Sequence, residues 1–489
     1  MFARPVSQNF GFGFRSARFF AILLIAPCGL AAQQPPPQDP HAGHGVQGAI
    51  PTLKPMLPQL GRSQQSPGGP RITLEELEQL ALANNPTLRQ AQAETGASQA
   101  RQRQAGLYPN PTVGYTGEEI RGGEFGGGQH GFFVSQTIVT GGKLGLSKKV
   151  ASHDVRIAEI EAGEQRMRVL NGIRIGYYRV LAAQEMLELK RDQLKISQDS
   201  LATLQQLRNI GQFDESEVLQ AEIELQQHEM AAAVQERSLR QAWRALAALT
   251  GKPALEPHTA VGQLDRNLPA LTDEQALQRI TQQSPAVEIA RAAAERSQAV
   301  VARERREPIP DIELRGGLQR NGELLAPGYR AGLQGFAEVG VNIPLFNRNQ
   351  GNVQAATLQA ERAQSEVQRV QLVLQERAAA VLDTYHEARI MTERYRTQLL
   401  PRAQRAYEQL LQRHGNMLAS WPVVLEAQRR LFQLQGEYIQ SLEMHWMAAI
   451  ALEGLLLTDA LEAPARPADV DLQIREINVP STARLGRRD

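Results

Sequence analysis

The chain has 489 residues, in which 53 Lys and Arg face 52 Asp and Glu, and aromatic residues make up only 5%. Because the charges nearly cancel, no basic surface for nucleic acid is expected, and nucleic acid is excluded as a partner. Ala, Gln, Leu, Glu and Arg crowd four stretches, approximately residues 71–108, 143–250, 272–306 and 350–457. This composition is typical of long helices.

The amino terminus has the features of an export signal in their usual order. The apolar run 19–25 follows three arginines and precedes small residues that extend to Ala32. This run is too short to cross a bilayer as a helix, and no other stretch of about eighteen uncharged apolar residues occurs. We therefore interpret residues 1–32 as an export signal, and we expect any membrane crossing to use strands.

Cys28 is the only cysteine, so no disulfide can form within the chain. Its surroundings, Ile-Ala-Pro-Cys-Gly at residues 25–29, resemble a bacterial lipoprotein box and make Cys28 a candidate lipid anchor. Pro27 departs from the small residue expected before a lipidated cysteine. We favour the alternative, in which Cys28 is removed with the signal by cleavage near Ala32.

Residues 33–70 are rich in Pro, Gln and Gly and show no apolar periodicity, which predicts a flexible leader. His41 and His44 lie in this leader and are weak candidates for a metal site. No third fixed ligand accompanies them, so we expect transient capture of cations at most. No cofactor is predicted. No nucleophile elbow, phosphate loop or zinc-protease motif occurs in its required context, which argues against an enzyme.

The most informative feature is an internal duplication. Matched positions 199 residues apart are Thr73 and Thr272, Pro86 and Pro285, Pro109 and Pro308, and Pro111 and Pro310. Tyr178 and Tyr385 continue the correspondence with a small shift, which places the differences in length in loops. A unit of about 200 residues is far larger than a solenoid repeat. We therefore predict a first repeat at residues 71–265, a second at 266–462, and a tail at 463–489.

Each repeat is predicted to begin with two helical pieces. Residues 73–76 (Thr-x-x-Glu) and 272–275 (Thr-x-x-Gln) have the pattern of a capping box. Pro86 and Pro285 then interrupt the helix, because proline lacks an amide donor and clashes with the preceding turn.

The hydrophobic period next changes from 3.6 to 2. In the second repeat, residues 312–319 and 333–343 alternate apolar and polar side chains, which predicts two amphipathic strands of about eleven residues each. The first repeat has a weaker version at 113–115 and 132–138, joined by the glycine-rich segment 122–128. The prediction is therefore four strands per chain.

Helical periodicity resumes after the strands and continues without proline to about Leu207 in the first repeat and Pro401 in the second. About sixty residues at a rise of 1.5 Å give a helix of roughly 100 Å, several times the length of an ordinary globular helix. Turns at Gly211 and Gly415 are then expected to reverse the chain, because glycine adopts positive φ without strain. A return helix follows each turn.

A strand of about eleven residues with one apolar face matches a tilted crossing of a bilayer. Four strands cannot close a barrel, and open edges are not tolerated in lipid, so the chain must pool strands with copies of itself. Three copies would give twelve strands and room for a pore. The predicted fold is mainly α, with a duplicated unit of long helices and a β-hairpin that forms a helical barrel and a trimeric membrane barrel.

The residues also resemble a known family. Over residues 72–460 the sequence is similar to the TolC family of outer-membrane efflux proteins, including Tyr-Pro-Asn-Pro-Thr at 108–112. The junctions at 134–143 and 343–351 look like the CzcC-type branch, which is associated with export of heavy-metal cations. Leu144 stands where a second basic residue is expected after Lys143, which departs from the branch pattern.

The resemblance implies a passive homotrimeric conduit in the bacterial outer membrane. It would contact outer-membrane lipid, and its helical part would lie in the periplasm. Its implied partners are a periplasmic adaptor and an inner-membrane pump of the RND type. Alternatives are an export channel for drugs or other organic compounds, a type I secretion channel, and an exported coiled-coil structural or adaptor protein. The strand pairs argue against the last of these.

The resemblance also implies site residues at the helix tips. Glu217 and Glu426 match positions where family members carry carboxylates at the periplasmic entrance, and threefold symmetry would make each a ring. The alternative is a solvated helix face. Gly211, Gly415, Met417 and Trp421 lie at the tips and are candidates for adaptor contact, although Trp421 and Met417 could equally pack into the core.

Overall fold

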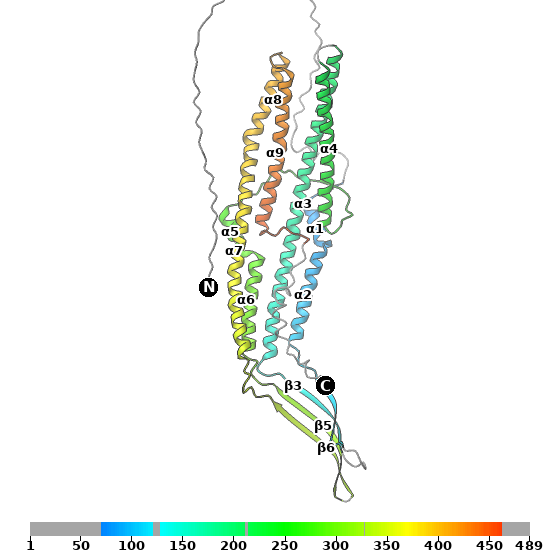
Figure 1. Ribbon diagram of the computed structural model, residues 1–489, viewed down its shortest axis with the longest axis vertical. Helices are drawn as coiled ribbons and strands as arrows, with labels where there is room; N and C mark the ends of the chain where they lie inside the picture. Colours follow the sequence, from blue (N-terminus) through cyan, green and yellow to red (C-terminus); the bar gives the residue numbers. More distant parts are fainter. Residues whose placement is uncertain (1–69, 121–127, 211–213, 327, 462–489) are drawn as a thin grey trace, which may run out of the picture. The chain divides into compact units, whose positions relative to one another are not determined.

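The computed structural model describes residues 70–120, 128–210, 214–326 and 328–461. Its long helices lie alongside one another, and a four-stranded sheet lies beyond one end of them (Figure 1). The two halves of the chain repeat one order of elements, which is two short helices, two strands, a long helix and a return helix.

The elements of the first half are β1 (Arg71–Ile72), α1 (Leu74–Asn84), α2 (Pro86–Ala105), β2 (Thr112–Glu118), β3 (Gln129–Ile138), α3 (Lys143–Asn209) and α4 (Glu215–Leu249). The strand β4 (Thr259–Ala260) follows them and ends the first half. The elements of the second half are α5 (Asp273–Gln283), α6 (Pro285–Glu304), β5 (Ile312–Ala326), β6 (Tyr329–Val341), α7 (Gln350–Arg394), the π-helical turn η2 (Tyr395–Leu399), α8 (Leu400–Gly415) and α9 (Trp421–Glu453). The short strands β1 and β4 pair in parallel, which joins the start of the first half to its end.

The helix starts agree with the sequence signals in all but one detail. Pro86 and Pro285 each occupy the first turn of a new helix, where the missing amide is not needed. Thr73 and Glu76 form both bonds of a capping box, with the Glu76 amide donating to the Thr73 hydroxyl at 3.3 Å. Thr272 also caps a helix, but its side chain makes no capping bond, so the second capping box was predicted wrongly.

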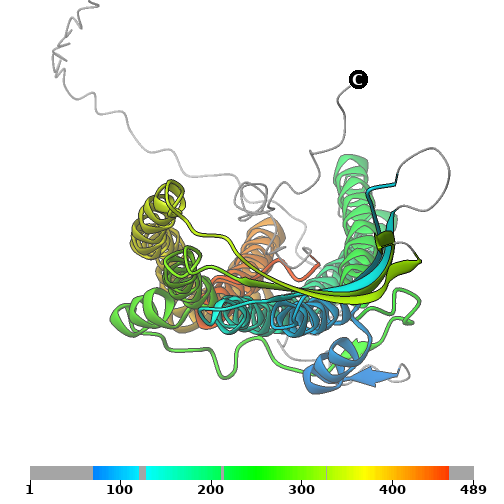
Figure 2. The same ribbon diagram turned by 90° about the horizontal axis from the view of Figure 1, so that it is seen from below.

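The strands form one antiparallel sheet in the order β2-β3-β5-β6, so β2 and β6 are its edges. β5 has 15 residues and β6 has 13, more than the eleven expected, whereas β3 has 10 and β2 only 7. One face exposes a band of apolar side chains, namely Val113, Tyr115, Phe132, Val134, Leu314, Leu318, Leu333 and Val339. Seen from below, the sheet is curved (Figure 2).

Pro401 does not end the helical path of the second half. The chain passes from α7 through the π-helical turn η2 into α8, whose first turn contains Pro401. Proline removes one donor and crowds the preceding turn, and a wider π turn accommodates both effects. Within the part of the chain that the structure describes, no helix is both long enough and apolar enough to span a membrane.

The 67-residue helix α3 is the centre of the packing. It contacts α2 and α6 towards the sheet and α4 and α9 towards the tips, and α1 packs on its middle part together with the ends of α4 and α9. The main apolar cluster joins Ile173, Leu181 and Leu246, all fully buried, with Trp243 and Tyr438. A second cluster around Tyr385 joins α5, α7 and α9.

Buried polar side chains bind the irregular segments near mid-length to these helices. Asn171 donates to the carbonyls of Gly454 and Leu457 at 3.1 and 2.8 Å, and Trp446 donates to Leu264 at 2.8 Å. A buried carbonyl without a partner is costly, so each bond fixes the path of a loop.

We predict that Tyr385→Phe destabilises the protein by about 1 to 3 kcal/mol. The Tyr385 hydroxyl accepts from the Leu271 amide at 3.0 Å and donates to the Pro269 carbonyl at 2.8 Å, so its loss leaves two partly buried backbone groups without their partner. Thermal unfolding in detergent, followed by circular dichroism, should show a lower midpoint. Tyr108→Phe, at an exposed tyrosine, is the control and should leave the midpoint unchanged.

Candidate functional site

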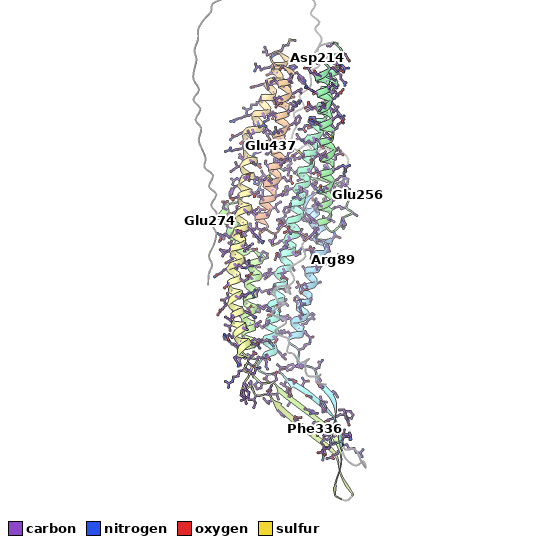
Figure 3. The ribbon with its side chains drawn as sticks, in the orientation of Figure 1. Arg89, Asp214, Glu256, Glu274, Phe336 and Glu437 are labelled. Carbon is purple, nitrogen blue, oxygen red and sulfur yellow. The ribbon has the colours of Figure 1, made fainter. Side chains whose placement is uncertain are left out.

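The helix tips lie at the end of the helices opposite the sheet, as the labels of Asp214 and Phe336 show (Figure 3). At the first tip, Asp214 is the N-cap of α4 and Glu217 is exposed in its first turn. The Asp214 side chain makes no capping bond. A small cluster of Leu204 and Val218 packs α3 against α4 beside the tip.

At the second tip, the positive φ was predicted at the wrong residue. Gly415 ends α8 without a positive φ, and the left-handed position is Met417, with φ of 59°. Two bonds hold this reversal, from the Leu418 amide to the Arg413 carbonyl at 2.8 Å and between His414 Nδ1 and the Ala419 carbonyl at 2.9 Å. Helices often end with a left-handed residue, and here bonds within the turn place it on a residue other than glycine.

The two apolar tip residues differ in environment. Met417 is 83% exposed, so its side chain is available to a partner. Trp421 is half-buried against the cluster of Tyr407, Val424 and Leu431, and its ring lies 5.2 Å from that of His414. Trp421 therefore packs between α8 and α9.

An ion-pair cluster joins the two halves of the chain near the tips. The Arg429 guanidinium on α9 donates two bonds to the Glu224 carboxylate on α4, at 2.8 and 2.7 Å. His228 Nε2 lies 3.6 Å from Glu224, and Glu426 lies 3.9 Å from Arg429. Bonds from His228 and Arg429 lower the pKa of Glu224 to about 2. Glu426 is 75% exposed and reaches this cluster only at its margin.

On the polar face of the sheet, the side chain of Arg315 is held in place by its neighbours. The Arg315 guanidinium lies 4.1 Å from the ring centre of Phe133 and 5.8 Å from that of Phe336, and 3.6 Å from the Glu338 carboxylate. Stacking on aromatic faces favours arginine. The Phe133 ring covers Gly114, where an added Cβ would lie 2.5 Å from it, so only glycine fits.

Two carboxylates are buried along α3. Burial raises the pKa of Glu161 to about 7, with Glu164 and Glu94 adding to the effect, and burial raises that of Glu185 to about 7, with a contribution from Asp265. A carboxylate whose pKa rises on folding stabilises the fold in acid. This contribution is present below pH 4.5 and is lost as the pH rises through about 7.

Several predicted residues lie outside the described part of the chain, namely Cys28, His41, His44 and Gly211. Among the described residues, no group of three His, Cys, Asp or Glu side chains could hold a metal ion. Sequence reasoning missed Glu224, His228 and Arg429. Their only signal was charge at helical spacing, Glu224 with His228 and Glu426 with Arg429, which does not show that α4 and α9 meet.

We predict that Glu224 and Arg429 stabilise the tips as a coupled pair. A double-mutant cycle tests this with the single variants Glu224→Gln and Arg429→Met and the variant that carries both substitutions. Losing a partly exposed pair costs about 1 kcal/mol, so amide hydrogen exchange near the tips should be roughly five times faster in either single variant. Exchange in the double variant should be little faster than in the single variants. Arg430→Met is the control. Additive effects of the two substitutions would contradict the coupling.

The same coupling should depend on pH. The depressed pKa of Glu224 means that the pair stabilises the tips above about pH 4.5 and that this contribution is lost as the pH falls towards 2. The ratio of the amide exchange rate in the Glu224→Gln variant to that in the wild type should therefore fall towards one as the pH is lowered from about 4.5 towards 2.

Comparison with known proteins agrees with this architecture. The curated relatives include the cobalt-zinc-cadmium resistance protein CzcC of Cupriavidus metallidurans, 27% identical over 403 residues that cover 82% of this chain and 93% of CzcC. They also include the nickel-cobalt-cadmium resistance protein NccC of Alcaligenes xylosoxydans xylosoxydans, 26% identical over 300 residues that cover 60% of this chain and 66% of NccC.

Solved structures share the fold. A crystal structure of CusC matches with a TM-score of 0.64 and 20% identity, over 78% of this chain and 91% of that one. The CmeC outer membrane channel of Campylobacter jejuni matches with a TM-score of 0.64 and 16% identity, over 84% and 90%. The family model of outer membrane efflux proteins matches residues 77–252 and 276–456. With paired strands, long helices and a match over most of its length, the chain belongs to the outer membrane efflux protein family.

Proposed function

We propose that this outer-membrane efflux protein works as a passive trimeric conduit for metal cations, fed by an inner-membrane pump of the RND type through a periplasmic adaptor. The observation that carries the proposal is a four-stranded sheet with two open edges and one apolar face, continuous with long helices. Open edges in lipid are costly, and a shared barrel of three copies removes all of them.

The cation substrate is supported by the relatives. CzcC is a cobalt-zinc-cadmium resistance protein, and NccC is a nickel-cobalt-cadmium resistance protein. The similarity to CzcC spans 93% of its length. Within the proposed trimer, the repeats at 71–265 and 266–462 would each supply one strand pair and one pair of long helices. A channel for organic compounds or secreted proteins would share this architecture, so the substrate is decided by resistance assays.

We further propose that Glu217 and Glu426 form two rings of carboxylates at the periplasmic mouth. Both side chains are exposed beside the tips. The Glu224 to Arg429 pair supports a closed resting mouth, because it holds α4 of the first repeat to α9 of the second. Gly415 and the exposed Met417 would lie near the adaptor, whereas half-buried Trp421 would support the tip from within.

We predict that the purified protein is a trimer in detergent, and that a strain lacking it loses tolerance to cobalt, zinc or cadmium. Native mass spectrometry measures the first and growth curves with complementation measure the second. A stable monomer or dimer as the sole folded species would refute the conduit. A trimer whose loss affects tolerance to organic compounds alone would refute the cation substrate.

We predict that Glu426→Gln lowers the cation preference of the channel in planar bilayers, and that Glu217→Gln lowers it less. Three like charges in a constriction attract cations, and salt screens the effect, so it should be strongest at low salt. Glu229→Gln removes one exposed charge from the middle of α4 and is the control. Unchanged selectivity in the double tip variant, with normal insertion, would mean that these glutamates form only a solvated face.

A further inference from the structure

Exposed basic side chains gather where the helices meet the sheet. The helices α2, α3, α6 and α7 each have one end beside the strands (Figure 1). Several cations at this level are exposed and have no ion pair with any residue that the structure describes. We call them the basic patch, and its members are Arg103, Lys148, Lys149, Arg305, Arg306 and Arg348.

Contacts between neighbouring helices bring the members of the basic patch together. The stem of Lys148 on α3 lies over Gly106, the C-cap of α2, where an added Cβ would lie 3.3 Å from Lys148 Cδ. Lys148 therefore lies beside the last turn of α2, which carries Arg103. On the other side of α3, Arg303 of α6 donates from Nε to the Ser147 hydroxyl at 3.1 Å.

The end of α6 is bonded in turn to the start of α7. The side-chain amide of Asn349 donates to the Glu304 carboxylate at 2.7 Å and to the Glu304 carbonyl at 3.0 Å. Arg305 and Arg306 directly follow Glu304, and Arg348 directly precedes Asn349. The basic patch therefore extends without a break from α2 to α7.

Most of the acidic groups at this level are already paired with other cations. Residues 304–313, which join α6 to β5, carry four carboxylates. Three of them lie 2.8, 3.7 and 2.9 Å from cations outside the basic patch, namely Glu304 and Glu307 from Arg303 and Asp311 from Lys143. The fourth, Glu313, is exposed on the polar face of the sheet, two residues before Arg315. The basic patch therefore keeps a net positive charge.

Helix dipoles do not account for this charge. The helices α3 and α7 begin at the basic patch, where the positive ends of their dipoles favour acidic residues, yet neither has one in its first turn. The helices α1, α4, α5 and α6 begin elsewhere, and each has one or two. Negative charge is thus absent from the first turns beside the sheet, although the dipoles would favour it there.

The apolar face of the sheet leads into the basic patch. Exposed apolar side chains flank this end of the sheet, namely Leu107, Tyr108, Val341, Ile343, Leu345 and Phe346. Phe346 is 92% exposed, and Arg348 follows two residues later. Lys148 lies about 8 Å along α3 at a rise of 1.5 Å per residue, and the headgroup region of one leaflet is roughly 5 to 8 Å thick. Apolar groups followed by cations within one headgroup thickness match the profile of a membrane surface.

We propose that the basic patch binds the phosphate groups of anionic phospholipids, in the leaflet of the outer membrane that faces the helices. The guanidinium groups bond the phosphate oxygens, the lysines act as point charges, and the exposed apolar side chains contact the acyl chains. Zwitterionic lipids carry a cation of their own, so the patch selects lipids with a net negative charge. The inference rests on membership of an outer-membrane family and needs neither the trimer nor the cation cargo proposed above.

Native mass spectrometry of the full-length protein in detergent tests this, with dioleoyl phosphatidylglycerol as the anionic probe and dioleoyl phosphatidylcholine as the zwitterionic probe. The wild type should retain the anionic lipid preferentially. The triple variant Lys148→Gln, Lys149→Gln and Arg306→Gln should bind it at least about tenfold more weakly, because each basic residue near a lipid surface contributes roughly fivefold in affinity. The variant Lys148→Arg, Lys149→Arg and Arg306→Lys keeps the charge and should bind like the wild type.

The matched control removes three exposed cations far from the sheet, with Arg377→Gln, Arg402→Gln and Arg405→Gln. It should keep the preference of the wild type. Equal losses of binding in the two glutamine variants would mean that the lipid responds only to net charge, which overturns the proposal. Equal binding of the two lipids by the wild type would also overturn it.

Two further measurements exclude other occupants of the basic patch. If the patch variant binds lipid normally but gains cation preference in planar bilayers, these cations face the lumen. If it binds lipid normally but no longer sediments with isolated peptidoglycan, that polymer is the partner. Either result overturns the proposal. A protein that is only monomeric in detergent would refute the proposed conduit, but lipid binding could still be measured on it.

Discussion

A helix of 67 residues is the constraint on which the rest of this structure depends. Helix propensity alone does not hold such a length rigid, so α3 must be covered by other elements along its course. The chain meets this requirement with α2 and α6 towards the sheet, α1 at mid-length, and α4 and α9 from mid-length towards the tips. The duplication helps to cover α3, because two helices of the second half, α6 and α9, pack against it.

Stability is unevenly distributed along the helices. Near mid-length, the apolar clusters are large, and buried polar bonds from residues such as Asn171 and Tyr385 fix the loops. At the tips, the clusters around Val218 and Tyr407 contain only a few buried side chains, and a surface ion pair joins the repeats. Regions with few buried contacts open at low cost. In the proposed conduit, the end that would open is therefore the end with the weakest packing.

The four-stranded sheet is stabilised differently from the helices. The sheet buries little on its own and leaves two edges and an apolar face exposed, and in the proposed trimer lipid and the other copies would cover them. On the polar face, Arg315 is held between two phenylalanine rings and a carboxylate, and Gly114 leaves room for one of those rings. This local network stiffens a sheet that lacks a core of its own.

The sequence by itself determined the elements, their order and the duplication. Periods of 3.6 and 2 are local properties of the chain, and Pro86, Pro285 and Thr73 act on the residues beside them, so they can be read without knowing the fold. Only the tertiary structure decided which distant residues meet. Glu224 and Arg429 are 205 positions apart and pair because α4 and α9 converge. Such pairings depend on the path of the whole chain, and no local pattern encodes that path.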